Sequence, residues 1–319
     1  MTDMRVAIVG AGGVGGFFGA QLYAGGVDAR FLARGSHYAA IKQNGLTVIS
    51  GGAPIVVPGD RFFDTPSGVG TSDVILFCVK SYDTEQTALS LGPMLHDHSV
   101  VVSLQNGVEN EEIIAHSLTK GSVFGGVAYI YATVTQPGTV TEWGGPKKIV
   151  FGPLREKEQM YAQGMKIFKM LVDGGVDTEY SANVGAALWS KFIFITAVGG
   201  ITALTRLTLG EILAVPETAR LLHAAMEESL AVARGAGAEI PPNFIEDAFA
   251  RLAKYDNKSR SSLYIDLANE RRLELDALSG AVVRFGTQYG VATPIHTLIY
   301  AALIPYHRAA VSRWTQGNS

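Results

Sequence analysis

The first 180 residues alternate between short apolar runs and longer segments of mixed polarity. The apolar runs predict five buried strands, at Arg5–Val9, Ala29–Ala33, Asp73–Val79, Ser99–Ser103 and Ser122–Gly126. Near-continuous, β-branched runs of this kind are typical of a parallel sheet that helices cover on both faces. Turn signals at Pro137-Gly138 and Gly144-Gly145-Pro146 predict an antiparallel extension between residues 128 and 152. One more helix is predicted over Leu154–Gly174.

Beyond about residue 180 the strand pattern disappears, and apolar residues recur at helical spacing as far as Arg313. Prolines at positions 216, 241, 242 and 294 fall where helices would begin or in the loops between them. The sequence therefore predicts an α/β fold, with a Rossmann-type doubly wound, mostly parallel sheet over residues 1–182 and an all-helical domain over residues 183–319. Ligands of such sheets bind beyond the carboxyl ends of the strands.

A glycine-rich loop, G-x-G-x-x-G, joins the first predicted strand to an amphipathic helix. Gly10 permits the tight turn, Gly12 lets a pyrophosphate approach the backbone, and Gly15 lets the helix pack against the sheet. The amide groups of Gly13 and Val14 begin the helix and point its positive dipole end at the phosphates. The loop predicts a dinucleotide site; the alternative is a strand-to-helix turn that binds nothing.

The end of the second strand indicates which dinucleotide is bound. Sites for NAD usually place a carboxylate there, about 20 residues after the glycines, to bind the ribose 2′-hydroxyl. This chain has Arg34 at that point and no carboxylate between Ala29 and Ala40. Because a guanidinium can bind a 2′-phosphate with two hydrogen bonds, we expect NADP(H) rather than NAD(H). The alternative is that Arg34 is an ordinary solvated cation of the loop.

Two polar side chains follow the third and fourth strands, where the carboxyl ends would face the cofactor. Lys80 comes directly after the third strand, and Asn106 stands in L-Q-N-G after the fourth. An amide side chain both donates and accepts hydrogen bonds, which suits the positioning of a nicotinamide, a ribose or a substrate oxygen. The alternative for Asn106 is a turn, for which Asn-Gly is a common pair.

The helical half contains two charged residues among apolar neighbours. Lys191 shares a predicted helix face with Ile195 and Gly199. A lysine on an apolar face loses hydration, so its pKa falls and its ammonium becomes a better proton donor near neutral pH. Glu274 is expected on a helix face with apolar residues, either functional or as a first-turn carboxylate that complements the helix dipole. Ser262 is either a helix N-cap or a substrate ligand.

Composition narrows the class of protein. A formal charge of −3 over 319 residues gives no reason to expect nucleic acid or an anionic membrane as partner. The single cysteine, Cys78, fits a reducing cytoplasm, and the seven histidines show no metal-ligand spacing. The longest apolar run, Phe192–Leu204, is shorter than the roughly 20 residues that span a bilayer. We therefore expect a soluble, cytoplasmic protein without a metal. The apolar stretch Leu298–Ile304 could form a homodimer interface or part of the core.

With these residues in place, the chain resembles the ketopantoate reductase (2-dehydropantoate 2-reductase) family. The motifs that carry the resemblance occur in order along nearly the whole chain: R-V-A-I-V-G-A-G-G-V-G-G, Arg34-Gly35, C-V-K at Lys80, L-Q-N-G-V at Asn106, L-W-S-K at Lys191, S-R-S-S-L-Y-I-D-L at Ser262, and L-E-L-D-A-L-S-G-A-V-V at Glu274. Several separated motifs in the right order are more specific than the glycine loop alone.

The resemblance implies an NADPH-dependent reductase of a small 2-oxo acid, ketopantoate, in pantothenate biosynthesis. By that analogy Lys191 protonates the ketone oxygen while hydride arrives at C2, and Glu274 holds the distal hydroxyl of the substrate and orients Lys191. Ser262 would bind the substrate carboxylate. Asn106 would contact the substrate or the nicotinamide ribose, and Lys80 would lie on the cofactor side.

The chain departs from the family pattern one and two turns after Lys191. Well-matched members carry Asn there, whereas this chain has Ile195 and Gly199. The resulting apolar wall leaves a second hypothesis open, a related NADPH-dependent reductase of a bulkier or less hydroxylated 2-oxo acid or ketone. A third is a non-catalytic NADP(H)-binding regulator, which would not need Lys191 and Glu274 together.

Overall fold

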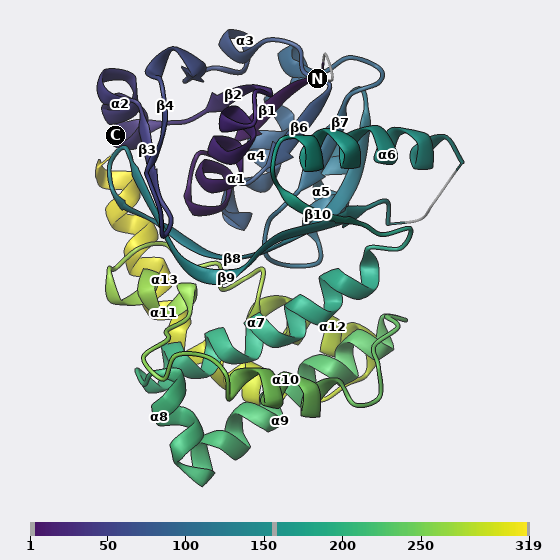
Figure 1. Cartoon of the computed structure of the whole chain (residues 1–319). Helices are drawn as coiled ribbons and strands as arrows, with labels where there is room; N and C mark the ends of the chain where they lie inside the picture. Colours follow the sequence, from purple (N-terminus) through teal and green to yellow (C-terminus); the bar gives the residue numbers. More distant parts are fainter. Residues whose placement is uncertain (1–3, 155–157, 318–319) are drawn as a thin grey trace. The chain divides into compact units, whose positions relative to one another are not determined.

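The computed structural model describes residues 4–154 and 158–317. By its internal contacts the chain divides into two compact units (Figure 1). Unit 1 comprises residues 1–105 and 109–185, and unit 2 comprises residues 106–108 and 186–319. The short segment Asn106–Val108 therefore belongs with the helical half of the chain. The sequence analysis placed a single domain boundary after residue 182 and did not anticipate this.

Unit 1 is built on one ten-stranded sheet in the order β4-β3-β9-β8-β7-β6-β1-β2-β5, with β10 paired to β9. Its strands are β1 Arg5–Val9, β2 Asp28–Leu32, β3 Leu46–Ile49, β4 Ile55–Val57, β5 Phe62–Phe63, β6 Val74–Phe77, β7 Val100–Ser103, β8 Ser122–Gln136, β9 Thr139–Gly152 and β10 Asp177–Tyr180. The run from β8 to β5 is parallel throughout, and only the β8–β9 and β3–β4 pairs are antiparallel. The predicted doubly wound, mostly parallel sheet is confirmed.

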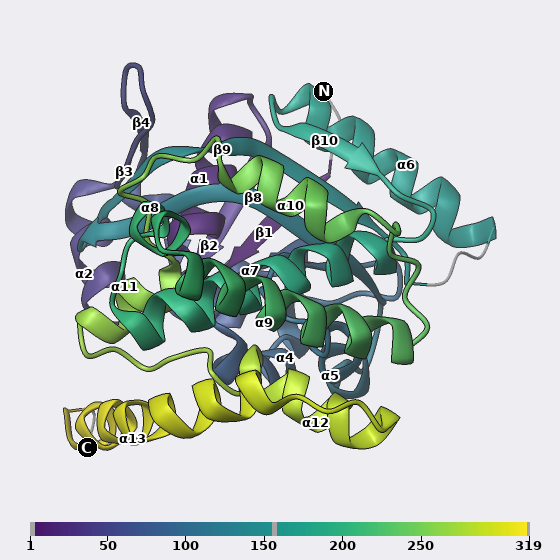
Figure 2. The ribbon, with the colours of Figure 1, turned by 90° about the horizontal axis from the view of Figure 1, so that it is seen from below.

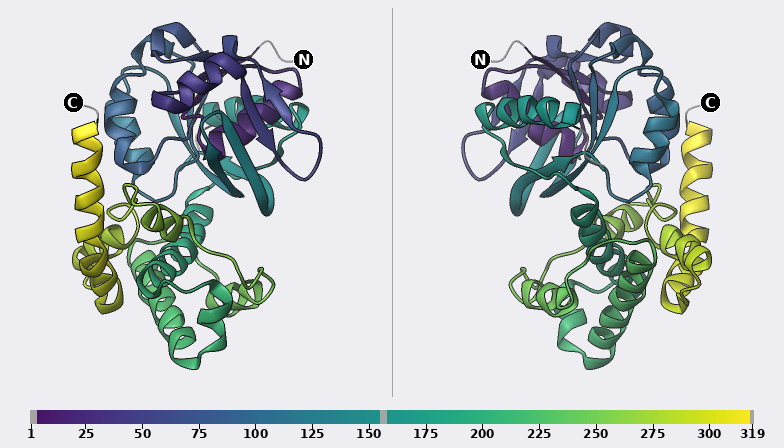
Figure 3. Two further views of the ribbon diagram at one scale, coloured as in Figure 1. Left: turned by 90° about the vertical axis from the view of Figure 1, so that its left-hand side faces the viewer. Right: turned by 90° about the vertical axis from the view of Figure 1, so that its right-hand side faces the viewer.

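Helices cover both faces of this sheet (Figure 3). They are α1 Gly13–Ala24, α2 Gly35–Asn44, α3 Pro66–Val69, α4 Thr84–Leu89, α5 Asn110–Ser117 and α6 Glu158–Asp173. Successive residues of a strand point to opposite faces. Accordingly, Val6 and Ile8 of β1 enter the core beneath α1 and α6, whereas Ala7 and Val9 enter the core beneath α4 and α5.

The antiparallel extension is longer and more irregular than the sequence predicted. Pro137 and Gly138 form the turn between two long strands, β8 and β9, as expected. The predicted turn at residues 144–146 is wrong, because these residues lie inside β9, where the pairing register shifts opposite Tyr131. Gly145 has a φ of +90°, and a Cβ there would lie 3.1 Å from the Cα of Ile130. These glycines therefore serve a bulge rather than a chain reversal.

The described part of unit 2 is helical. Its helices are α7 Gly185–Thr205, α8 Leu209–Ala214, α9 Pro216–Gly235, α10 Phe244–Leu252, α11 Ser262–Ala268, α12 Ser279–Tyr289 and α13 Pro294–Gly317. Local signals start several of them: Thr208 and Glu211 form a capping box on α8, and Pro216 is the first residue of α9. The helices α12 and α13 lie side by side (Figure 2). The predicted all-helical second domain is confirmed.

The helix α7 supplies the centre of the unit 2 core. Ile193, Ala197 and Ile201, spaced by one helical turn each, are fully buried in it. Among the described residues, α7 is the one helix long and apolar enough to cross a membrane, although about half of its most apolar stretch is buried inside the protein. Such a helix is equally typical of the core of a protein. The helix α7 is longer than the apolar run Phe192–Leu204, because it begins at Gly185.

Candidate functional site

The glycine loop connects β1 to α1 with three glycines in three different environments. Gly10 has a φ of +98°, and a Cβ there would lie 2.9 Å from the backbone nitrogen of Val79. A Cβ on Gly15 would overlap the carbonyl oxygen of Gly10. Gly12, the N-cap of α1, has no atom within 4 Å of an added Cβ. The first and third glycines therefore permit close packing, whereas the second leaves bare backbone open to an approaching ligand.

The start of α1 is well placed to receive negative charge. Its first residues, Gly13 and Val14, contribute amide groups that a helix does not use internally. A Cβ on Gly13 would overlap the carbonyl oxygen of Ala132 in β8, so the helix begins in direct contact with that strand. The N-terminal amides are thus held by the sheet rather than by a mobile loop.

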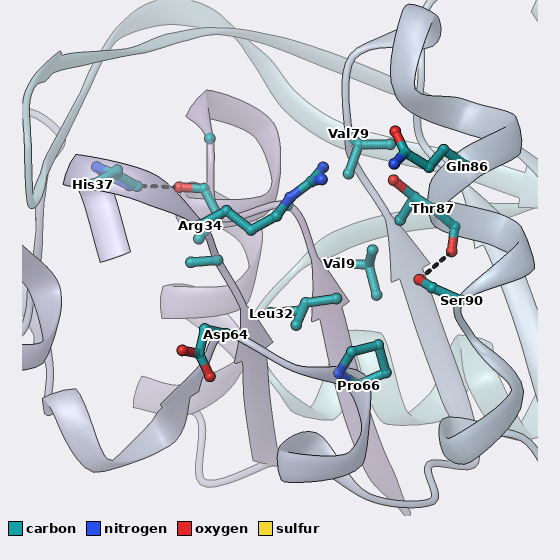
Figure 4. Close-up of a pocket in the computed structure, with 14 residues that line it drawn as sticks. Val9, Leu32, Arg34, His37, Asp64, Pro66, Val79, Gln86, Thr87 and Ser90 are labelled. Atoms are coloured by element: carbon teal, nitrogen blue, oxygen red, sulfur yellow. Dashed lines mark hydrogen bonds between the residues drawn. The ribbon is translucent and has the colours of Figure 1, made fainter. Parts of the chain in front are cut away.

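A cavity of about 300 Å³ lies beside this loop in unit 1. It is lined by the glycine loop, the end of β2, the turn after β5 and the helix α4. Arg34 is the N-cap of α2, and its side chain extends across the cavity toward Val79 (Figure 4). Its Nη2 lies 3.6 Å from a carboxylate oxygen of Asp83, and 56% of the side chain is exposed. The guanidinium is therefore accessible to a further anion.

The ends of β6 and β7 are joined by a carboxamide that the sequence analysis did not single out. Gln105, 5% exposed, donates from Nε2 to the carbonyl oxygen of Val79 at 2.9 Å and to the hydroxyl of Thr84 at 2.8 Å. Gln105 directly precedes Asn106 along the chain, and Val79, whose carbonyl oxygen it binds, directly precedes Lys80. Gln105 thus fixes the backbone next to both candidate residues. The motif L-Q-N-G contained it, but sequence spacing could not reveal a partner 26 residues away.

A buried carboxyl group lies behind the end of β7. Glu111, in the first turn of α5, is 2% exposed, and neither of its carboxyl oxygens accepts a hydrogen bond from a described residue. Burial raises its pKa to about 7, because it penalises the charged carboxylate. The sequence analysis did not single out this side chain, which stands between Glu109 and Glu112 in a charged segment.

In unit 2, Lys191 and Glu274 influence each other electrostatically. Lys191 lies in the second turn of α7, and burial lowers its pKa from 10.5 to about 8, while the charge of Glu274 acts to raise it. Glu274 is 6% exposed. The expected helical position of Glu274 is wrong: it lies in the loop before α12, which begins only at Ser279. Its burial therefore comes from the path of that loop and not from a helix face.

Ser261 and Ser262 stand at the start of α11, and only Ser261 caps the helix. Ser261 is the N-cap, and its hydroxyl oxygen accepts a hydrogen bond from the Tyr264 amide at 3.0 Å. It also lies 2.6 Å from the Thr202 hydroxyl of α7. Ser262 is the first residue of the helix and is exposed, so its hydroxyl is not the cap. The N-cap alternative for Ser262 is therefore wrong.

The face of α7 after Lys191 is apolar. Ile195 packs with Val108 against the cluster formed by Phe192 and Leu278. Within unit 2, the segment Asn106–Val108 therefore meets this cluster through Val108. At Gly199 an added Cβ would lie 3.6 Å from Leu263, an ordinary contact distance. The position therefore has room for a small side chain that the sequence does not supply.

The candidates are thus divided between the two units. The glycine loop, Arg34 and Lys80 belong to unit 1, whereas Asn106, Lys191, Ser262 and Glu274 belong to unit 2. Within the part of the chain that the structure describes, no group of three or more His, Cys, Asp or Glu side chains could hold a metal ion.

Comparison with known proteins gives one consistent family. Residues 6–156 match the family described as ketopantoate reductase PanE/ApbA, and residues 183–307 match its C-terminal part. A 2-dehydropantoate 2-reductase of Archaeoglobus fulgidus is 31% identical over 91% of this chain and 94% of its own length. That of Halobacterium salinarum is 29% identical over 92% and 95%. The crystal structure of a PanE/ApbA family ketopantoate reductase from Ralstonia eutropha superimposes with a TM-score of 0.85 at 32% identity, covering 96% of this chain and 99% of that one.

Proposed function

The chain belongs to the ketopantoate reductase family of nicotinamide-dependent oxidoreductases, and from that premise we propose that it reduces 2-dehydropantoate (ketopantoate) to pantoate with NADPH, in pantothenate biosynthesis. The observation that carries the proposal is the pairing of Lys191, with its pKa lowered to about 8, with the buried Glu274. Perturbed pairs of this kind are concentrated at catalytic sites. The names of the relatives support the reaction.

A nicotinamide dinucleotide suits the residues of unit 1. The open backbone at Gly12, with Gly10 and Gly15 shaping the loop, leaves space for a pyrophosphate. The amides of Gly13 and Val14 would bind its oxygens.

The choice between NADP(H) and NAD(H) rests on the end of β2. Arg34 would bind the 2′-phosphate, and no carboxylate follows β2 to compete for the ribose. Lys80 would contact the cofactor from the end of β6. When bound, the cofactor supplies the hydride.

The protein's own contribution is charge and geometry. Reduction of a 2-oxo acid builds negative charge on the former ketone oxygen, which the Lys191 ammonium stabilises before donating a proton from Nζ. The charge of Glu274 keeps Lys191 protonated and would orient it, and its carboxylate would accept from the distal hydroxyl of the substrate. Ser262 would bind the substrate carboxylate, and Asn106 the substrate or the nicotinamide ribose.

The direct test is NADPH oxidation with ketopantoate, run beside a panel of other 2-oxo acids and with NADH in place of NADPH. Efficient turnover of ketopantoate with NADPH would support the proposal. A panel member preferred over ketopantoate would contradict the substrate assignment. Binding of NADPH without turnover of any panel member would favour the regulator hypothesis over a reductase.

A second candidate is the reduction of a less hydroxylated 2-oxo acid. It is favoured by the apolar environment of Ile195 beside Val108 and Leu278, and by the absence of a side chain at Gly199. An apolar wall leaves a substrate hydroxyl without a hydrogen-bond partner, which costs binding free energy. The same panel distinguishes this candidate, because ketopantoate would then be a poorer substrate than a 2-oxo acid with an aliphatic or aromatic tail.

A further inference from the structure

His37 connects three segments of unit 1 through its imidazole ring. It lies in the first turn of α2, three residues after Arg34. Its Nε2 lies 2.9 Å from the carbonyl oxygen of Ala11, and the backbone nitrogen of Gly138 lies 3.0 Å from its Nδ1. Because a carbonyl only accepts and an amide N–H only donates, the ring is neutral with its proton on Nε2. Burial lowers the pKa of His37 below its usual 6.5, which favours this neutral form.

One end of this bridge lies in the glycine loop, and the other lies at the tip of the β8–β9 hairpin. Ala11 stands between Gly10 and Gly12 in the glycine loop, and its bond to His37 lies beside the cavity that Arg34 crosses (Figure 4). Gly138 forms the tip of the β8–β9 hairpin, and its carbonyl oxygen accepts a hydrogen bond from the Thr47 amide in β3 at 2.9 Å. His37 therefore links the pyrophosphate loop to the start of α2 and to the sheet.

The helix α2 is anchored near its C-terminal end by Lys42, which donates from Nζ to the carbonyl oxygens of Gly59 and Phe62, each at 3.1 Å. Ile41 is its only fully buried side chain. Its first residue, Gly35, has a φ of +64° and no atom within 4 Å of an added Cβ, so the joint with β2 is loosely packed. In the first turn, Tyr38 packs against the unit 1 core, and the two hydrogen bonds of His37 connect this turn, and with it Arg34, to the glycine loop and to the hairpin tip.

We propose that His37 is a positioning residue for cofactor selection: it sets the spacing between the pyrophosphate-binding loop and Arg34, so that a 2′-phosphorylated dinucleotide is bound in preference to one without that phosphate. This inference rests on the proposed use of NADP(H). It differs from a general structural role in one respect. Loosening α2 weakens the contact with the 2′-phosphate, which NADH lacks, whereas a damaged glycine loop would weaken both cofactors alike.

The test measures dissociation constants for NADPH and NADH on the free protein by calorimetry, so that it needs neither substrate nor turnover. His37→Phe keeps a ring of similar size but removes both hydrogen bonds. If this variant does not fold, His37→Asn is used instead, because its side chain is too short to reach both partners. His37→Gln retains one donor and one acceptor. His98→Phe, at an exposed histidine of the same unit, is the matched control.

We expect His37→Phe to raise the Kd of NADPH about tenfold and that of NADH less than about threefold, in line with the loss of two neutral hydrogen bonds. His37→Gln should recover most of the loss, and His98→Phe should change neither constant. In an Arg34→Ala background, His37→Phe should have little further effect on NADPH. Equal weakening of both cofactors, or losses that add in the double variant, would overturn the proposal. If the parent protein does not prefer NADPH, the cofactor assignment itself fails, and that result is seen before any variant is made.

Discussion

The lowered pKa of Lys191 predicts how turnover should depend on pH. A fall from 10.5 to about 8 corresponds to about 3 kcal/mol, at about 1.4 kcal/mol for each tenfold change in protonation. Burial is the cause, because it penalises the charged ammonium, and the charge of Glu274 offsets part of that penalty. With a pKa of about 8, roughly nine-tenths of Lys191 is protonated at pH 7 and roughly one-tenth at pH 9.

If Lys191 is the proton donor, kcat/KM should therefore fall about tenfold for each pH unit above about 8. The assay is the initial rate of NADPH oxidation between pH 6 and pH 10 with the preferred 2-oxo acid. Replacing Glu274 by Gln removes the charge that raises the pKa of Lys191, so the falling limb should move to lower pH. Lys191→Ala should lower kcat by orders of magnitude while NADPH still binds.

Glu270→Gln is the matched control, because this carboxylate is exposed and pairs with Arg313. It should leave the position of the limb unchanged. A rate that stays constant from pH 7 to pH 9, or a limb that Glu274→Gln leaves in place or moves to higher pH, would refute the assignment of Lys191 as the acid.

Three other predictions concern different parts of the molecule. Arg34→Ala should weaken NADPH at least about tenfold more than NADH, since it removes a charged hydrogen-bond pair; equal losses in binding titrations would contradict the 2′-phosphate role. Ile195→Asn should improve kcat/KM for ketopantoate if the apolar wall limits its use, and no gain would place specificity elsewhere. The folded protein keeps a proton on Glu111 up to about pH 7, whereas the unfolded chain releases it near pH 4.5. The free energy of unfolding should therefore fall as the pH rises from about 4.5 through 7. Glu111→Gln should then stabilise the protein by up to about 3 kcal/mol at pH 8 and hardly at all at pH 4; equal thermal shifts at both pH values would refute it.

Much of the architecture follows from local sequence because its physical requirements are local. A strand buried on both faces must be apolar throughout, so β1, β6 and β7 could be located to within a few residues. The turn out of β1 needs a left-handed residue at Gly10, which restricts the choice there to glycine. No β-branched strand pattern occurs after about residue 180, and this indicated where the helical half of the chain begins.

Elements at the edges of the sheet left no comparable signal. The strands β3, β4, β5 and β10 are two to four residues long, and β10 carries charged residues, so the sequence did not predict them. Glu274 had helical spacing to its apolar neighbours but lies in a loop, because the chain turns through residues 275–278 before α12 begins. Burial there depends on what packs over the loop, which periodicity does not record.

The candidate residues of unit 1 show the same difference between what is local and what is tertiary. Sequence alone determined that glycines and an arginine stand where a dinucleotide would need them. Only the tertiary structure decided what holds those groups in place, since His37 bonds to residues 26 and 101 positions away and Gln105 to a carbonyl 26 positions away. Such partners are set by which strands become neighbours in the sheet. That choice depends on the packing of the whole unit, because every local segment is compatible with several neighbours.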